Sequence, residues 1–380
     1  MDFIINKEQE QFKRETIEFA KNNLNEKEFF NNFSTKMWNK TADFGLLGIT
    51  IGEEYGGLGE SYLTASLIFE ALGYGCKNNG FVFAVNNHIW VAQNLIYLYG
   101  TKILKDKYVK DMVKGNKIGA IAITEADSGS DALSMSTKAI EKEGYFYISG
   151  SKMFVSNGPI ADLFIVFAVT EEEPKKKITA FVVEKDFNGI KVSEDINKMG
   201  LDACPTAEIH FDNCYVPNEN ILGYFNRGEV LLNHALEWER CFEFVSHIGA
   251  MRRIMDRCIE HVNTRKQFNK YIGENQSISH KISDMQVSIE MAELMMYKIA
   301  WLKDQGKTAY LETCIFKLYV SEHYIQACRD ALQIFGGYGY TKEYEIEREL
   351  RDALGCSIYS GTNEIQKNAI YNMASVNSYY

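Results

Sequence analysis

The stretch LFIVFAVTEEEPKKKITAFVVE, residues 163–184, decides the fold class of the central part of the chain. Two runs rich in β-branched and aromatic residues, 163–169 and 178–184, flank a charged segment that contains a proline. This pattern predicts two antiparallel strands joined by an exposed hairpin loop. Similar short runs, broken by polar residues or glycine, occur at 120–124, 145–150 and 207–216. The region from Gly119 to Asn220 is therefore predicted to form a small antiparallel β-barrel or sandwich.

The flanking regions have a different texture, because all four prolines of the chain lie in this central part, at positions 159, 174, 205 and 217. Apolar residues recur at helical spacing from Lys7 to Lys114. After Gly228 we expect long helices over 229–264, 277–304 and 308–335, and a last helix over 361–375. The predicted fold is α+β and multidomain: an N-terminal helical domain (1–115), a middle antiparallel β-barrel domain (116–228) and a C-terminal four-helix bundle (229–380).

Composition excludes several classes of function. The 380 residues are 46% hydrophobic, which is enough for a large core, and their net charge of −10 argues against a nucleic-acid partner. No run approaches the roughly 18 apolar residues of a membrane-spanning helix, and the first 15 residues are too charged for a signal peptide. We therefore expect a cytoplasmic protein without membrane insertion. The eight cysteines contain no CxxC pair, so we expect reduced thiols and no structural metal.

Two segments carry candidate ligand-binding residues. AIAITEADSGSD (120–131) follows a predicted strand and places Thr124, Gly129 and Ser130 in a turn where hydroxyls and bare N–H groups can approach a ligand. GSKMFVSNG (150–158) ends a second strand with an aromatic and a hydroxyl side chain that can pack on a planar ring. Taken alone, a Gly-Ser turn after a strand is equally compatible with a plain structural turn.

Three further motifs complete a pattern that spans nearly the whole chain: residues 198–223, RKQF at 265–268, and ALQIFGGYGYTKEYEIERELRD at 331–352. Together with the two segments above, they resemble the acyl-CoA dehydrogenase family. The resemblance implies a non-covalent FAD between the middle domain and the bundle. It also implies a homotetramer, or a dimer, in which a neighbouring subunit supplies part of the cofactor site.

The resemblance also implies individual cofactor contacts. The flavin ring and ribityl chain would be lined by Ile123, Thr124, Gly129, Ser130, Phe154 and Ser156, with Ser156 facing the flavin N5. The diphosphate and adenosine would be held by Arg265 and Phe268 from a neighbouring subunit, and by Gln276, Gln333 and Gly337. Thr362 and Glu364 are further cofactor contacts in this interpretation.

The catalytic base needs a separate argument. Most of the family carries it as the glutamate of a Tyr-Glu-Gly-Thr sequence, whereas this chain has YSGT at 359–362, and a serine hydroxyl is too weak a base. A subgroup that includes isovaleryl- and long-chain acyl-CoA dehydrogenases places the glutamate in Leu-x-x-Glu-Arg on a bundle helix. This chain has LEWER at 236–240, so Glu239 is predicted to be the base. The alternative is that Glu239 merely pairs with a cation on its helix.

The predicted reaction is α,β-dehydrogenation of an acyl thioester. Glu239 would remove the α-proton, and the β-hydride would pass to flavin N5. The implied substrate contacts are Ser130, Arg240, Tyr359, Ser360 and Gly361. The Ser360 backbone N–H and the ribityl 2′-hydroxyl would polarise the thioester carbonyl. Arg240 would support either the phosphopantetheine chain or a local ion-pair network.

The sequence leaves the carrier and the electron acceptor open. The thioester is on CoA or on a carrier protein, and carrier-protein relatives oxidise aminoacyl groups such as prolyl. The flavin would be reoxidised by electron-transferring flavoprotein or by oxygen, and the choice is open because Phe154 replaces the tryptophan that the family usually has there. A flavin monooxygenase or a non-catalytic flavoprotein of the same fold is the alternative function. Glu239 discriminates against it, since only a dehydrogenase needs that carboxylate.

Overall fold

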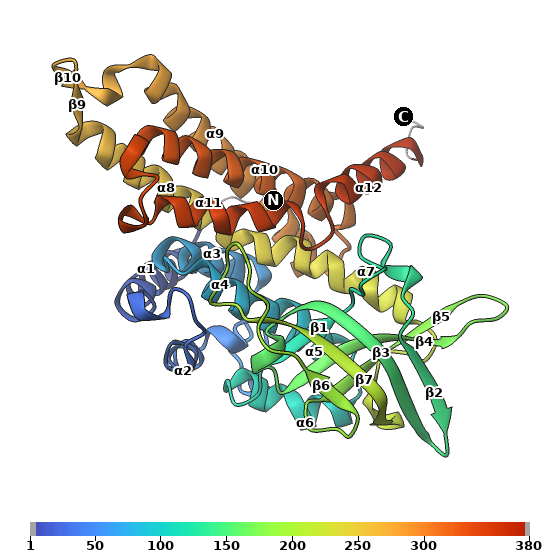
Figure 1. The fold of residues 1–380 in the computed structure, drawn as a ribbon. Coiled ribbons are helices and arrows are strands. Elements are labelled where there is room, and N and C mark those ends of the chain that lie inside the picture. Colours follow the sequence, from blue (N-terminus) through green and yellow to red (C-terminus); the bar gives the residue numbers. More distant parts are fainter. Residues whose placement is uncertain (1–4, 377–380) are drawn as a thin grey trace.

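The computed structural model describes residues 5–376, in which a layer of C-terminal helices lies above the N-terminal helices and a β-sheet (Figure 1). The N-terminal part contains the helices α1 (Lys7–Asn23), α2 (Thr35–Asp43), α3 (Tyr62–Gly75), α4 (Asn79–Asn86), α5 (Asn94–Tyr99) and α6 (Lys102–Val113). Their starts follow capping rules: the Ser61 and Thr101 side chains accept hydrogen bonds from the third residue of α3 and α6. A π-helical turn, Asn87–Gln93, joins α4 to α5.

The sheet of the middle region has the strand order β6-β7-β3-β2-β4-β5-β8, with β1 beside β4. Its strands are β1 (Gly119–Ala122), β2 (Lys138–Lys142), β3 (Tyr145–Ser156), β4 (Leu163–Glu171), β5 (Lys177–Glu184), β6 (Ile190–Val192), β7 (Thr206–Pro217) and β8 (Ile221–Leu222). The hairpin predicted over 163–184 is present, with Leu163 opposite Glu184.

One detail of the antiparallel expectation is wrong, because β4 pairs in parallel with β1 and touches β2 in parallel at one position. Parallel neighbours need a long connection, and the chain supplies one, since β2 and β3 lie between β1 and β4 in sequence. The short run 120–124 carries no signal for strand direction. Only the packing of Ala120 and Ala122 with the apolar residues of β4 reveals the pairing.

The C-terminal region closely follows the predicted segments. The helices are α7 (Gly228–Trp238), α8 (Phe244–Thr264), α9 (Gln276–Asp304), α10 (Tyr310–Phe335), α11 (Ile346–Leu354) and α12 (Asn363–Val376), and a small hairpin is formed by β9 (Lys266–Gln267) and β10 (Lys270–Tyr271). Two features differ from the sequence expectation. A π-helical turn, Glu239–Glu243, interrupts the segment expected over 229–264, and α11 is an additional helix.

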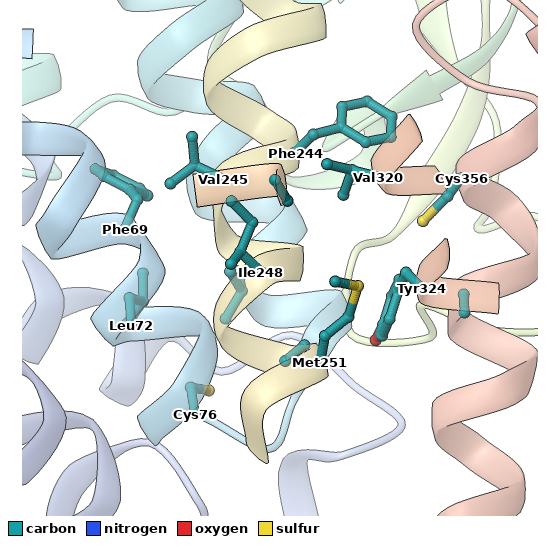
Figure 2. Close-up of a cluster of buried hydrophobic side chains, with 14 of the residues drawn as sticks. Phe69, Leu72, Cys76, Phe244, Val245, Ile248, Met251, Val320, Tyr324 and Cys356 are labelled. Atoms are coloured by element: carbon teal, nitrogen blue, oxygen red, sulfur yellow. The ribbon is translucent and has the colours of Figure 1, made fainter. Parts of the chain in front are cut away.

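Helices α3 and α8 join the N-terminal and C-terminal parts by a close crossing. Gly73 and Gly249 make it possible, since a Cβ on Gly249 would overlap the Glu70 carbonyl and one on Gly73 would overlap that of Ser246. Around this crossing, side chains of α3, α8 and α10 interlock in one buried cluster, in which Phe69, Ile248 and Val320 are fully buried (Figure 2). The crossing fixes the start of α8, and with it the π-helical turn just before it.

All eight cysteines are free and buried, as expected of reduced thiols. Within residues 5–376, no helix is both long enough and apolar enough to cross a membrane.

Candidate active site

Glu239 and Ser360, 121 positions apart in the chain, meet in the structure. The Ser360 hydroxyl lies 2.8 Å from Glu239 Oε1. The two residues are therefore direct neighbours in the fold. Ser360 stands where most of the family has its glutamate, and it contacts Glu239, the glutamate of the bundle helix. Glu239 forms no ion pair within residues 5–376 by the usual 4 Å distance, which argues against its alternative role as a partner of a helical cation.

Backbone geometry aims Ser360 at this contact. Ser360 has φ 58° and Gly361 has φ 80°, both in the left-handed region, which costs about 1–2 kcal/mol for a residue with a Cβ. Two buried side chains fix the strained turn: Arg240 Nε and Gln366 Nε2 donate to the Ser360 carbonyl at 3.3 and 3.2 Å. The Ser360 backbone N–H donates no hydrogen bond to any of residues 5–376 and is free for a ligand oxygen.

The surroundings of Glu239 raise the pKa of its carboxyl above the ordinary glutamate value. Burial is the main cause. The Ser360 hydrogen bond and the positive charges of Arg240 and Lys317 act in the opposite direction and limit the rise. A carboxylate with a raised pKa is a stronger base than a solvated one, so it is better matched to abstracting a carbon-bound proton near neutral pH.

A pH profile follows from this shift. The base works only when ionised, so flavin reduction at saturating thioester should slow as the pH falls through the raised pKa of Glu239. We expect the midpoint of this acid limb above about 4.3, the ordinary glutamate pKa. Anaerobic stopped-flow absorbance across the stable pH range measures it. A limb at or below the ordinary value would contradict the assignment of the base.

The other charged residues of the LEWER segment have different partners. Glu237 is buried and bound by Lys303 and by the backbone N–H of Ala309, so it is committed to the packing of α7 on α9 and α10. Arg240 is also buried, contacts Cys314 Sγ and lies 5.3 Å from the Tyr310 ring centroid. Its hydrogen bonds therefore support the Ser360 turn, and a direct contact with the substrate stays a prediction.

Tyr359, which precedes Ser360 in the chain, packs against aromatic and polar neighbours. Its hydroxyl lies 2.7 Å from His247 Nε2 and 3.0 Å from Cys356 Sγ, and its ring centroid lies 4.6 Å from that of Phe83. Burial lowers the pKa of His247 to about 3, so the imidazole is neutral here. Tyr359 forms a rigid wall of the site; substrate contact by Tyr359 and Gly361 stays a prediction.

The predicted flavin loop is held by a buried ion pair that sequence reasoning missed. Lys152 Nζ lies 2.8 Å from Glu125 Oε1 and donates to the Ile123 carbonyl at 3.0 Å, and Lys152 is fully buried. The other Glu125 oxygen accepts from the Ser136 backbone and hydroxyl. Thr124, Gly129 and Ser130 are thereby displayed on a fixed turn, in which a Cβ on Gly129 would meet nothing within 4 Å.

Two large aromatics of the predicted cofactor set face outward. Phe154 is 62% exposed and Phe268 is 94% exposed, and both have left-handed φ angles, 56° and 51°. Exposed apolar rings held in strained conformations are typical of binding surfaces. Ser156, two residues after Phe154, is partly buried, and its neighbour Asn157 donates to the Ala84 carbonyl of α4. The end of β3 is therefore anchored on α4, the helix that precedes Asn87.

Arg265 and Gly337 line one cavity of 620 Å³ together with His261, Gln267, Phe335 and Tyr338. The Arg265 guanidinium lies 5.4 Å from the Tyr338 ring centroid. Cβ atoms on Gly336 and Gly337 would point into open space, so bare backbone faces the cavity. An Arg fork, bare backbone and an aromatic ring suit a diphosphate with an adenine, so these residues fit FAD.

The remaining predicted contacts are placed as follows. Gln276 begins α9 and is exposed, as is Gln333 in the last turn of α10. Thr362 accepts a hydrogen bond from the Ile365 backbone at the start of α12, where Glu364 is exposed. Their contact with FAD stays a prediction, as does that of Ile123.

A second buried carboxyl, Glu243, was not singled out from the sequence. It lies on the same π-helical turn as Glu239, is fully buried, and its Oε2 lies 3.1 Å from the Ser360 hydroxyl. Asn87 Nδ2 donates to its Oε1 at 2.6 Å. The available signal was a glutamate four residues after Glu239 in the apolar run CFEFV, but nothing in the sequence pairs it with Asn87.

Comparison with known proteins agrees with this fold. Family models for acyl-CoA dehydrogenase match residues 6–116 (N-terminal domain), 120–214 (middle domain) and 226–374 (C-terminal domain). The chain therefore belongs to the acyl-CoA dehydrogenase family, FAD-dependent oxidoreductases that act on the CH–CH bond of acyl thioesters.

Within the family, the chain is similar to proteins whose substrates are attached to a carrier protein. It is 36% identical to the L-prolyl-[peptidyl-carrier protein] dehydrogenase of Pseudomonas fluorescens, over 89% of this chain and 90% of the relative. The crystal structure of the prolyl acyl carrier protein oxidase AnaB matches with a TM-score of 0.96 and 38% identity, covering 97% and 99% of the two chains. PigA with FAD and proline matches with a TM-score of 0.95 and 32% identity over the full length of both.

Proposed function

We propose that this protein dehydrogenates an acyl thioester at its α,β-carbons with Glu239 as the base. The observation that carries the proposal is the 2.8 Å contact between Glu239 and Ser360. Glu239 is the only carboxylate of the LEWER segment that forms no ion pair within residues 5–376. The contact places it beside Ser360, the position where the family usually has its glutamate.

Each residue has a defined task in this proposal. The Glu239 carboxylate takes the proton from the α-carbon. The free N–H of Ser360 donates to the thioester carbonyl and stabilises the negative charge that develops on its oxygen. Arg240 and Gln366 keep that N–H in place by holding the Ser360 carbonyl. When bound, FAD accepts the hydride that leaves the β-carbon.

The cofactor site is assigned to two surfaces. Thr124, Ser130, Phe154 and Ser156 would hold the flavin end, and the cavity beside Arg265 and Gly337 the diphosphate and adenosine. We assign this cavity, together with Phe268, to a neighbouring subunit's cofactor, because Phe268 is almost fully exposed at the tip of the β9–β10 hairpin. The same proposal includes a homo-oligomer and a cytoplasmic location. It divides the chain into the domains 1–115, 116–228 and 229–380.

The proposed substrate is a short acyl or aminoacyl group on a carrier protein. The names of its prolyl-carrier relatives favour this over a CoA ester. The wall formed next to Ser360 by the partly buried Tyr359 and the buried Phe83 also favours a compact group. A CoA ester is the second candidate, because other relatives of similar identity are acyl-CoA dehydrogenases. The electron acceptor, electron-transferring flavoprotein or oxygen, is part of the same question.

Anaerobic bleaching of the visible flavin absorbance tests both candidates in one series. The purified yellow protein is mixed with prolyl and short acyl groups loaded on phosphopantetheinylated carrier protein, and with the same groups on CoA. We expect bleaching by a carrier-loaded group at least about tenfold faster than by its CoA ester, equivalent to about 1.4 kcal/mol of discrimination. Equal or faster bleaching by the CoA ester would favour the second candidate.

The same series tests the whole class. If FAD is bound and no thioester bleaches it, the dehydrogenase proposal fails and a monooxygenase or a non-catalytic flavoprotein is favoured. Free proline and unloaded carrier protein serve as controls, since neither presents a thioester.

A further inference from the structure

One serine hydroxyl bridges two carboxyl groups at the site. Ser360 Oγ lies 2.8 Å from Glu239 Oε1 and 3.1 Å from Glu243 Oε2. Ser360 is 5% exposed and Glu243 is 0% exposed, and both distances are those of direct hydrogen bonds. Both glutamates lie on the π-helical turn Glu239–Glu243, and such turns are frequent at functional sites.

Counting protons shows that one carboxyl must be neutral. A hydroxyl has a single hydrogen and can donate it to one oxygen only. If both glutamates were ionised, one of the two contacts would bring Ser360 Oγ and a carboxylate oxygen to hydrogen-bond distance with no hydrogen between them. Two good hydrogen bonds therefore need a second proton, carried by one carboxyl and donated to Ser360 Oγ.

Burial points to Glu243 as the neutral acid, because Glu243 is fully buried whereas Glu239 is only partly buried. The Asn87 amide is oriented by donating to the Phe83 carbonyl at 3.1 Å, and the same nitrogen donates to Glu243 Oε1 at 2.6 Å. Oε1 is thus the accepting oxygen, which leaves Oε2 as the O–H that faces Ser360. Glu239, by contrast, is partly exposed.

The charges around the pair agree with this assignment. Burial and the nearby charge of Glu239 raise the pKa of Glu243 well above the ordinary value, and they outweigh the hydrogen bonds with Ser360 and Asn87 and the charge of Lys317, which lower it. The positive groups are Arg240 on the same turn and Lys317 on α10. The Lys317 Nζ donates a hydrogen bond to Asn363 Oδ1 at 2.7 Å. The other titratable groups that face Glu243 are the thiols of Cys204 and Cys356 and the Tyr359 hydroxyl, and burial keeps all three neutral.

We propose that Glu243 is a positioning residue that stays protonated and donates to Ser360 Oγ, so that the serine hydrogen points at Glu239 and holds it ionised and in place. The chain of donors runs in one direction, from Asn87 and Glu243 through Ser360 to Glu239. The α-proton of the substrate goes to Glu239, and Glu243 keeps its own proton throughout. This inference rests on the proposed role of Glu239 as the base.

The variant Glu243→Gln tests the proposal because an amide reproduces a neutral acid. Its nitrogen donates to Ser360 and its oxygen accepts from Asn87, so we expect flavin reduction within about threefold of wild type and an unchanged acid limb. Glu243→Leu keeps the size and removes both functions. We expect it to reduce flavin at least about tenfold more slowly, with the acid limb shifted to higher pH, since a misdirected Ser360 stabilises the Glu239 carboxylate less.

Several outcomes would overturn the proposal. If Glu243→Gln is as slow as Glu243→Leu, the site needs a titrating carboxyl at this position. If the acid limb of Glu243→Gln lies at lower pH than that of wild type, the substitution has removed a negative charge. Glu243 would then be ionised in the wild-type protein. Should Glu243→Leu fold poorly, the pH profile of Glu243→Gln still decides.

An infrared measurement separates this proposal from the proposed function. In the holoenzyme at neutral pH, the carbonyl band of a protonated carboxylic acid should be present in wild type and Glu239→Gln and absent in Glu243→Gln. Glu229→Gln, an exposed substitution on α7, is the control. This band needs no turnover, so it tests Glu243 even if no thioester is a substrate. Its persistence in Glu243→Gln would refute the neutral acid.

Discussion

Replacing Glu239 by Gln is expected to slow flavin reduction by a thioester about 10³- to 10⁴-fold and to leave FAD binding unchanged. The amide is nearly isosteric with the carboxylate and still accepts the Ser360 hydrogen bond, so the fold of the turn is preserved. It cannot take a proton, and the Ser360 hydroxyl is too weak a base to replace it. Stopped-flow absorbance under anaerobic conditions measures the rate, and the bound flavin spectrum measures the loading.

The matched control for this variant is Glu229→Gln, which removes the same charge from the exposed face of α7. It should reduce flavin at the wild-type rate. A Glu239→Gln protein that binds FAD and reduces it as fast as the control would show that the base lies elsewhere, and the assignment from the LEWER segment would be wrong.

The second large effect is expected from Lys152→Met, which should lower the free energy of unfolding by about 3–5 kcal/mol and weaken FAD binding. Lys152 is fully buried, and without it Glu125 retains a buried charge with only the Ser136 and Thr137 donors. Burial alone would raise the pKa of Glu125, but the hydrogen bonds from Lys152 and Thr137 lower it to about 2. That stabilisation is present above the unfolded-state pKa of about 4.3 and is lost as pH falls toward 2.

Two further variants give this prediction its contrast. Lys185→Met also removes a lysine that donates to a backbone carbonyl, that of Pro159, but Lys185 is exposed, so we expect a loss below about 1 kcal/mol. Combining Lys152→Met with Glu125→Gln removes both charges and should recover part of the stability. Denaturant unfolding of all three proteins, with FAD affinity measured in parallel, makes the comparison. Equal losses for the Lys152 and Lys185 variants would contradict the buried-pair argument.

The long C-terminal helices and the β4–β5 hairpin were predictable because their signals are local. Apolar periodicity predicted 277–304 and 308–335, and the structure has α9 at Gln276–Asp304 and α10 at Tyr310–Phe335. The strands of residues 163–184 were equally clear, since the charged loop between them enforces antiparallel pairing. The parallel neighbour of β4 was not predictable, because strand direction depends on which distant chain segment packs beside it.

The residues of the site also divide into those that the sequence predicted and those that only the structure revealed. The sequence identified Glu239 and the unusual Ser360 as a pair by comparing two motifs, and the structure brings them to hydrogen-bond distance. It gave no indication of Glu243 with Asn87, or of Lys152 with Glu125 as a buried pair. Each of these contacts joins residues whose types are common and whose partner is fixed only by tertiary packing.

By itself, the sequence determined the family, the order of helical and β regions and the FAD chemistry, and it predicted Glu239 as the base, because each is encoded in residue types at fixed spacing. Only the tertiary structure decided which carboxyl is buried beside Asn87, where the left-handed turn at Ser360 points, and which cation neutralises Glu125. The physical reason is that pKa values and hydrogen-bond direction depend on burial and on neighbours within a few ångströms. Those neighbours come from segments far apart in the chain.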